Sequence, residues 1–568
     1  MENIRIIKTQ DDKECILIKK DNKEKALGSK YNFKNDLNKL ISEIKDESIN
    51  IETNVIILGL YNGQYLKEIK EQLTSKNRVI IFEFNKEIYD NYGDKVPKEF
   101  EIYLYNEDFD LKKINISSLN FKIITFGNYE KLYEEQCNNV YKFLKQIVVN
   151  SKIEKNTLNK FSNTWFECAI NNIKSILEND KLSRFKDYYK GYPAVIVSAG
   201  PSLEKNIKTL KKLEDKVVII AGGRTLKPLL DNNIKPTFVC VVDPGEGSYN
   251  VIKETLNCSV PLVVNEVSNF KVVNEYKGNK IFYNNHLNSD FCEHFFENKE
   301  KTFLFSGGSV AHASTDLARY LGCREIIFIG QDLAYTNNNK HASIANYEKI
   351  NLEQNFDLIV DDINGEKIGT SYVLNEFRVA LENYIEAYKD SIKFINATEG
   401  GSNIIGTKIK TLQEVVQTYK NNKNLKNIEV KSYFNDNYKK IVKSKFQTLL
   451  IDLKKIKKMS QDVLESNNKF LKYYKSANIN KYICDLENKE NKVIRYINSL
   501  KVISLVLIPV IEEVLKSNDY IPKKETTYDE KVKLNYLQTQ RLYSQIIIKV
   551  DFCTNIIINA LGENIEKL

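Results

Sequence analysis

The 568-residue sequence contains no apolar run long enough to cross a bilayer. The most apolar run of its C-terminal part, residues 502–511, falls short of the roughly 20 residues that a spanning helix needs, and it includes Pro509. The nine cysteines are scattered, and no two have the spacing of a zinc or redox pair. The charged segment 1–20 does not resemble a signal peptide. We therefore expect a cytoplasmic protein without a membrane span.

Recognisable metal motifs are also missing. The sequence has no HExxH motif, and no DxD motif stands at the end of an expected strand. Asp361 and Asp362 are adjacent, but they precede INGE, a sequence typical of a solvated turn. Only four histidines occur: His286, His294, His312 and His341. The sequence predicts no metal site and no bound cofactor.

A strong charge imbalance is absent as well. The 84 basic and 75 acidic residues give a net charge of +9 and are mixed along the chain, so we expect no nucleic-acid groove. The length favours several domains, and 42% hydrophobic residues can fill a core in each. We expect an N-terminal α/β domain (1–140), a helical connector (141–190), a central Rossmann-like domain (191–425) and a helical domain (426–568).

In the N-terminal part, the apolar segments 55–60 and 79–84 flank an amphipathic stretch, which predicts a βαβ unit. Gly59 and Gly63 in the first turn, with Glu83 after the second strand, resemble a nucleotide-binding Rossmann turn such as that of a methyltransferase. The glycine pattern is incomplete. The alternative is a degenerate α/β domain that provides shape or a protein contact.

The central part alternates apolar strands with helical segments, which predicts a doubly wound, mainly parallel sheet. After residue 425 the apolar residues recur at helical spacing, as in Val442, Phe446 and Leu449. This helical region provides packing or contacts with a second copy, or it docks a protein acceptor. The expected central strands are residues 194–200, 217–223, 238–244, 260–266, 280–285, 303–309, 325–335 and 392–401.

Residues 194–203, AVIVSAGPSL, join a β-branched strand to a small-residue turn and a helix start. The free N–H groups and the dipole of a helix N-terminus form a site for phosphate. The alternative is an ordinary βα turn. Residues 305–322 repeat the arrangement with a glycine-rich turn, and two such turns in one domain favour a nucleotide or diphosphate ligand.

Small and polar residues follow the expected strands and should meet at the carboxyl edge of the sheet. His341 lies on a polar loop, and its ordinary pKa near 6.5 suits proton transfer, although an idle loop histidine is the alternative. His312, within a helix, is expected to be structural. The predicted ligand-binding residues are Gly200, Pro201, Ser202, Gly222, Gly223, Arg224, Asp243, Asn265, Ser306, Gly307, Gly308, Ser309, Gln331, Asp332 and Glu399.

Five segments of the central part together resemble the motility accessory factor family. They are GPSL (200–203), the stretch 219–244, SGGSVAH (306–312), GQDLAY (330–335) with His341, and NATEGGSNIIGT (396–407). These segments keep a consistent order over about 210 residues. The N-terminal α/β and C-terminal helical parts also match the organisation of that family.

The resemblance implies a glycosyltransferase that moves pseudaminic or legionaminic acid from its CMP-activated form onto Ser or Thr hydroxyls of flagellin, without a metal. The central part is also similar to bacterial sialyltransferases that use CMP-sialic acid. By motif, residues 200–202 and 306–309 would hold CMP, Asp243 would lie near the nucleotide, and His341 would act as base or acid. Tyr335 would support departure of CMP. The alternatives are a pterin-type diphosphokinase of the same fold and a noncatalytic flagellin-binding chaperone.

Overall fold

The computed structural model divides into two compact units, Met1–Thr157 and Leu158–Leu568. It describes residues 4–20, 23–45, 53–73, 77–106, 109, 111, 114, 121–285, 294–295, 301–336, 339, 341–345, 356–431, 436–520, 522 and 526–562.

The first unit contains two sheets. An antiparallel meander is formed by β1 (Ile4–Lys8), β2 (Glu14–Lys20) and β3 (Lys23–Ala26). The other sheet is parallel, in the order β6 (Glu101–Leu104), β5 (Val79–Glu83), β4 (Asn54–Leu58) and β7 (Phe121–Thr125). The expected βαβ unit is thus present as β4, α2 (Leu66–Gln72) and β5. The remaining helices are α1 (Phe33–Ile44), α3 (Lys86–Tyr92) and α4 (Tyr129–Leu132), followed by the long α5 (Glu134–Glu178).

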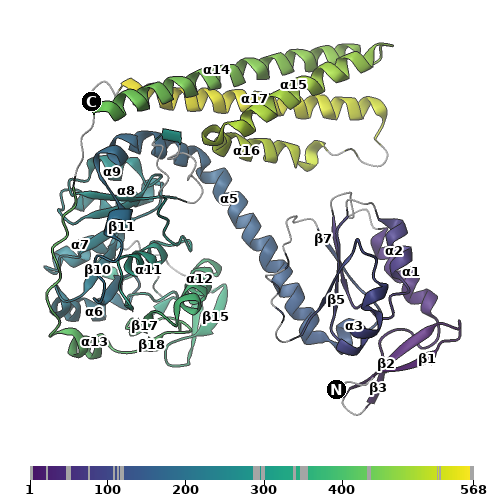
Figure 1. Ribbon diagram of the computed structural model, residues 1–568, viewed down its shortest axis with the longest axis horizontal. Helices are drawn as coiled ribbons and strands as arrows, with labels where there is room; N and C mark the ends of the chain where they lie inside the picture. Colours follow the sequence, from purple (N-terminus) through teal and green to yellow (C-terminus); the bar gives the residue numbers. More distant parts are fainter. Residues whose placement is uncertain are drawn as a thin grey trace. The chain divides into compact units, whose positions relative to one another are not determined.

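The second unit is built on a nine-stranded sheet in which every pairing is parallel. Figure 1 shows this sheet with helices around it. Most strands are runs of β-branched and aromatic residues, as expected for strands covered on both faces. In spatial order they are β18 (Lys408–Ile409), β17 (Lys393–Asn396), β14 (Glu325–Ile329), β9 (Ala194–Val197), β10 (Val218–Gly222), β11 (Phe238–Val241), β12 (Leu262–Asn265), β13 (Lys280–Tyr283) and β8 (Asp180–Lys181).

Helices cover both faces of this sheet. Ile196 and Ile220 pack in one core with α11 and α12, whereas their neighbours Val195 and Ile219 pack on the other face with α6 and α13. The expected doubly wound α/β fold is therefore confirmed. The helices are α6 (Leu203–Leu210), α7 (Gly223–Asp231), α8 (Glu246–Ile252), α9 (Phe270–Glu275), α11 (Val310–Tyr320), α12 (Tyr372–Tyr388) and α13 (Leu412–Tyr419).

One expected strand is wrong. Residues 303–309 form no strand: Phe303 makes an isolated bridge with Asn284, and the following residues turn into α11. Two glycines and two serines in that segment offer little apolar surface to bury in a sheet, and they suit a turn. A short antiparallel hairpin, β15 (Leu358–Asp361) and β16 (Lys367–Thr370), was not expected from the sequence.

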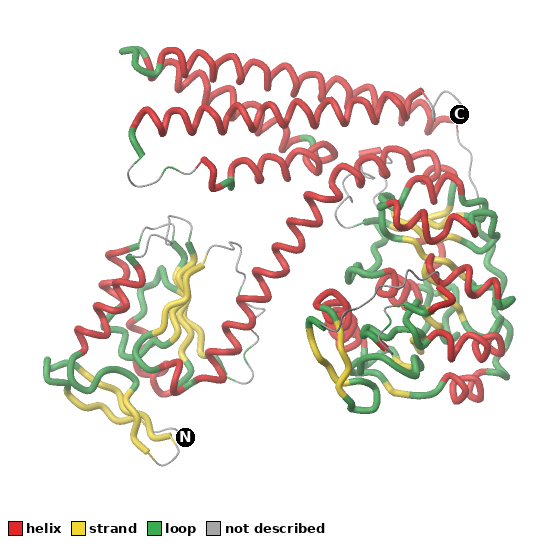
Figure 2. Tube along the Cα trace, turned by 180° about the vertical axis from the view of Figure 1, so that it is seen from behind, coloured by secondary structure: helices red, strands yellow, loops and turns green. Residues whose placement is uncertain are grey.

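The C-terminal region is helical, as expected, and its long helices run alongside one another (Figure 2). Val442, Phe446 and Leu449 are buried in one apolar core with residues of all four helices. None of the described helices is long and apolar enough to span a bilayer. The helices are α14 (Asp436–Tyr473), α15 (Ile479–Ser499), α16 (Lys501–Leu515) and α17 (Tyr528–Ala560).

Candidate functional site

A cavity of about 640 Å³ opens at the carboxyl edge of the nine-stranded sheet. The sheet reverses its direction of winding at β9: β10 to β13 follow on one side, and β14, β17 and β18 lie on the other. Ligands of open α/β sheets bind at such a switch point. The predicted residues that line the cavity are Gly200, Gly222, Gly223, Arg224, Asp243, Ser309, Gln331, Asp332 and His341.

The first predicted phosphate site, at the start of α6, already holds a carboxylate of the protein. The hydroxyl of Ser202 donates to Asp332 Oδ1 at 2.6 Å, and the backbone N–H of Ser202 points at the same carboxylate, 3.2 Å from Oδ1. Thr336 Oγ1 also donates to Asp332, at 2.7 Å. Burial raises the pKa of Asp332, and these donors offset part of that rise. The GPSL turn is therefore closed by the GQD segment.

The glycines around Asp332 are explained by contacts within the protein. A side chain at Gly200 would overlap the Asp332 carboxylate, and one at Gly401 would overlap the Asp332 backbone. A side chain at Gly400 would overlap the Ser202 hydroxyl. Three of the motifs that suggested a ligand, GPSL, GQDLAY and NATEGGSNIIGT, thus pack together around the buried Asp332 carboxylate.

The start of α7, by contrast, is open to the cavity. Its N-cap residue Gly222 contributes no capping side chain, and Gly222 and Gly223 line the cavity. Arg224 follows within the first turn, and the described residues offer its guanidinium no ion pair or hydrogen bond. Burial lowers the pKa of Arg224. Free N–H groups, a helix dipole and an uncompensated cation together attract an anion.

The glycine-rich turn before α11 is packed against two rings. A side chain at Gly307 would lie 2.7 Å from the His312 ring, and one at Gly308, whose φ is 89°, would lie 2.7 Å from Phe377. His312 is fully buried and has a pKa lowered to about 4 by that burial. Its Nε2 donates to Phe377 O at 2.9 Å, and its Nδ1 lies 3.1 Å from Ser309 Oγ. His312 is structural, as expected.

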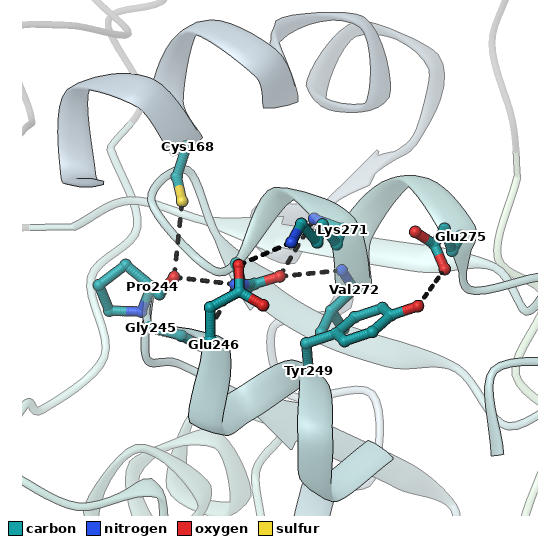
Figure 3. A network of polar contacts seen from close by, with 9 residues as sticks. Cys168, Pro244, Gly245, Glu246, Tyr249, Lys271, Val272 and Glu275 are labelled. Carbon is teal, nitrogen blue, oxygen red and sulfur yellow. Dashed lines mark hydrogen bonds and ion pairs between the residues drawn. The ribbon is translucent and has the colours of Figure 1, made fainter. Parts of the chain in front are cut away.

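Asp243 follows β11, and the residues directly after it are fixed by hydrogen bonds and an ion pair to other segments. Cys168 Sγ and the Asn269 amide donate to Pro244 O, at 3.8 and 2.9 Å, and Lys271 pairs with Glu246 at 2.8 Å (Figure 3). The Asp243 side chain is exposed within the concave cavity, where the surrounding protein raises the pKa of its carboxyl.

The other predicted residues lie outside the cavity lining. The Tyr335 ring stacks on Phe356 with a centroid distance of 5.6 Å. Asn265 is buried and accepts from the backbone N–H of Val267, while Glu399 accepts from Asn206 and from the start of α13. The remaining residues outside the lining are Pro201, Ser202, Ser306, Gly307 and Gly308.

Several residues of the cavity lining were not predicted from the sequence. Lys160 and Phe161 come from α5, Ser248 from α8, and Leu374 and Phe377 from α12. None of them follows a strand of the sheet, so no strand-end pattern could identify them. Phe161 lies one helical turn before Trp165, but that spacing is typical of a helix packed on a core, where Trp165 is buried.

The Rossmann-like turn of the first unit is filled by the protein itself. Glu83 is fully buried, and its Oε2 accepts from the backbone N–H of Leu60 at 2.8 Å and from the Tyr129 hydroxyl at 2.7 Å. A side chain at Gly59 would overlap the Tyr129 ring. This favours the alternative of a degenerate α/β domain. Within the described residues, no three His, Cys, Asp or Glu side chains gather as a metal site would require.

Comparison with known proteins agrees with this fold. Residues 167–338 match the family model of the 6-hydroxymethylpterin diphosphokinase MptE-like domain. No curated protein matches the chain. The solved structure of a MAf glycosyltransferase from Magnetospirillum magneticum AMB-1 matches with a TM-score of 0.57 at 14% identity, covering 100% of this chain and 95% of that one. In fold, over its whole length, the chain is similar to that glycosyltransferase, as the sequence resemblance implied.

Proposed function

We propose that this protein is a glycosyltransferase that moves pseudaminic or legionaminic acid from its CMP-activated form onto Ser or Thr hydroxyls of flagellin. One observation carries the proposal: an open helix start and the uncompensated Arg224 face a cavity at the switch point of the sheet. The likeness in fold to a MAf glycosyltransferase over the full chain supports it.

The donor phosphate lies at the start of α7 in this proposal. CMP leaves with a single phosphate, and the N–H groups of residues 223–225 together with Arg224 can balance its charge. His341 and Asp243 also line the cavity and can exchange protons with bound groups. No metal is assigned a step in this proposal.

The helical C-terminal region is proposed to contact the protein acceptor. Residues 426–568 contain 26 basic and 17 acidic residues, so the whole net charge of +9 lies in this part of the chain. A positively charged surface favours encounter with an acidic protein.

Intact-mass measurement of flagellin tests the proposal. The protein is incubated with flagellin and either CMP-pseudaminic or CMP-legionaminic acid, with excess EDTA present. We expect one donor to add the mass of its sugar. Flagellin binding without a mass change would favour the chaperone, and a requirement for magnesium would overturn the metal-independent transfer.

A pterin-type diphosphokinase is the second candidate, because residues 167–338 match the model of that family. It requires ATP and magnesium, and it consumes a hydroxymethylpterin. Release of AMP from ATP in the presence of that pterin, without transfer to flagellin, would support it. The two candidates therefore differ in donor, metal requirement and product.

A further inference from the structure

The cavity has two ends, which the order of the strands defines. The backbone N–H of Ala342 donates to Ala199 O at 2.9 Å, so His341 belongs to the end beside β9. Asp243 follows β11, two strands away. Strand spacing places these two strand ends about 10 Å apart. The start of α7 follows the intervening β10 and therefore lies between them.

The carboxylate of Asp243 differs from three buried acidic groups of this unit, each of which accepts hydrogen bonds from the protein. Asp316 accepts from Phe305 N and the Tyr384 hydroxyl, and Glu266 accepts from Asn284 and Asn285. Asp332 is occupied by Ser202 and Thr336. The structure shows no donor or cation on the Asp243 carboxylate within the described residues, although this group lines the cavity. A carboxylate that lines a cavity and accepts no hydrogen bond from the protein has all its lone pairs available to a bound substrate.

The backbone beneath Asp243 is fixed by two residues after β12. Ser268 Oγ donates to Val241 O at 2.9 Å, and the backbone N–H of Asn269 donates to Asp243 O at 3.2 Å. The Asn269 side chain donates to the carbonyls of Pro244 and Gly245, at 2.9 and 3.2 Å. These bonds fix the backbone that carries the Asp243 carboxylate, so they hold this group at the β11 end of the cavity.

The same end of the cavity suits an acidic sugar. The Phe161 ring lies near Gly245, where an added Cβ would be 3.9 Å from it, an ordinary van der Waals distance. Lys160 Nζ lies 5.2 Å from the centroid of that ring. A nonulosonic acid carries a carboxylate on its anomeric carbon, so it needs a cation in addition to the one that holds phosphate. Lys160 supplies this cation, and the Phe161 ring offers an apolar face.

We propose that Asp243 is the general base of the transfer and that the sugar occupies the β11 end of the cavity. This inference rests on the proposed function. The acceptor oxygen bonds to the anomeric carbon while its proton passes to a carboxylate oxygen of Asp243. The bond from that carbon to the phosphate oxygen breaks, and its electron pair leaves with CMP. His341, on the other side of the phosphate, donates a hydrogen bond to the departing nucleotide.

The test compares Asp243→Asn with Glu246→Gln in the full chain, measuring the rate of transfer to flagellin and the affinity for CMP by calorimetry. Glu246 begins α8, three residues after Asp243, lies outside the cavity lining and is paired with Lys271. Asp243→Asn should lower the rate by about 10²- to 10⁴-fold while CMP affinity stays within about twofold. Glu246→Gln should change neither quantity.

Chemical rescue provides a second measurement. Asp243→Ala leaves space for a small carboxylate, so added formate should restore part of the rate and should not accelerate Asp243→Asn. Circular dichroism establishes that each variant is folded, and Asp243→Glu, which keeps a carboxylate, should retain measurable transfer.

Three results would overturn the inference. CMP affinity could fall in parallel with the rate of Asp243→Asn, which would place Asp243 at the nucleoside. The variant could keep more than a tenth of the wild-type rate, or formate could fail to rescue a folded Asp243→Ala. A wild-type protein that neither binds CMP nor transfers a sugar would instead overturn the proposed function, and the inference with it.

Discussion

The two parallel sheets of this chain carry the same sequence features and differ in what fills them. Each has a glycine-containing turn after a buried strand and an acidic residue at a strand end. In the first unit, Glu83 and the Tyr129 ring close the turn at Gly59. In the second, Asp332 closes the turn at Gly200, but the start of α7 stays open.

The closed and open turns differ in what can supply a negative charge to their backbone N–H groups: a carboxylate of the protein in the closed turns, and a ligand in the open one. A carboxylate within the protein takes the position at the helix start or strand end where a phosphate would otherwise bind, since both accept from the same backbone N–H groups. Glycines are then needed because a side chain would collide with the protein. The sequence pattern is the same in either case, and only the open turn can accept a ligand.

The largest effect is expected at the closed turn of the first unit. Burial raises the pKa of Glu83 from 4.5 to about 7. Between these values the unfolded chain releases a proton that the folded unit keeps, so stability falls as pH rises from about 4.5 to 7 and is level above that. The change is about 3 kcal/mol. Hydrogen exchange of the β4 amides in the full chain, corrected for intrinsic rates, measures it.

Glu83→Gln should remove this pH dependence, whereas the exposed Glu99→Gln, which loses a surface pair with Lys70, should keep it. Unchanged protection of β4 across this pH range in the wild type would mean that Glu83 is not enclosed as the structure shows. The turn at Gly59 in the first unit would then not be an example of a turn closed by a buried carboxylate.

The next largest effect is expected at the open turn. Arg224→Met keeps much of the side-chain length and removes the charge, so CMP should lose one charge-assisted contact, worth about 1.5–3 kcal/mol, or roughly tenfold to a hundredfold in affinity. Calorimetry with CMP measures this change, and Glu83→Gln serves as a matched control with unaltered affinity. Full affinity in Arg224→Met would place the phosphate elsewhere.

Much of the fold could be predicted because its signals are local. Runs such as residues 217–221 and 326–329 are β-branched or apolar throughout, and this pattern alone indicates a strand buried on both faces. The segment 303–309 was mistaken for a strand because its first three residues are apolar, while the glycines that follow impose a turn. The two-residue strands β8 and β18 are too short to show any periodicity.

The candidate site could be predicted only in part, because contacts between segments distant in the sequence decide which turns are closed and which residues line the cavity. Arg224, Asp243 and Gln331, which were predicted from the strand ends, line the cavity. Nothing in the local sequence shows that Asp332 binds Ser202, 130 residues earlier, or that Phe377 covers Gly308. Lys160 and Phe161 reach the cavity from a helix that was expected to be only a connector.

The smallest effect is expected at Ser202, in the closed turn that follows β9, and it distinguishes this turn from the open start of α7. The Ser202 hydroxyl donates to Asp332 and lies outside the cavity lining, so Ser202→Ala should cost about 1.5 kcal/mol of stability and leave CMP affinity within about twofold. Urea unfolding and CMP calorimetry measure the two quantities. The exposed Ser343→Ala, which removes a surface hydrogen bond to Glu204, is the matched control and should change stability by less than about 0.5 kcal/mol. A loss of CMP affinity in Ser202→Ala at unchanged stability would return the phosphate to the start of α6, where the GPSL motif alone had placed it.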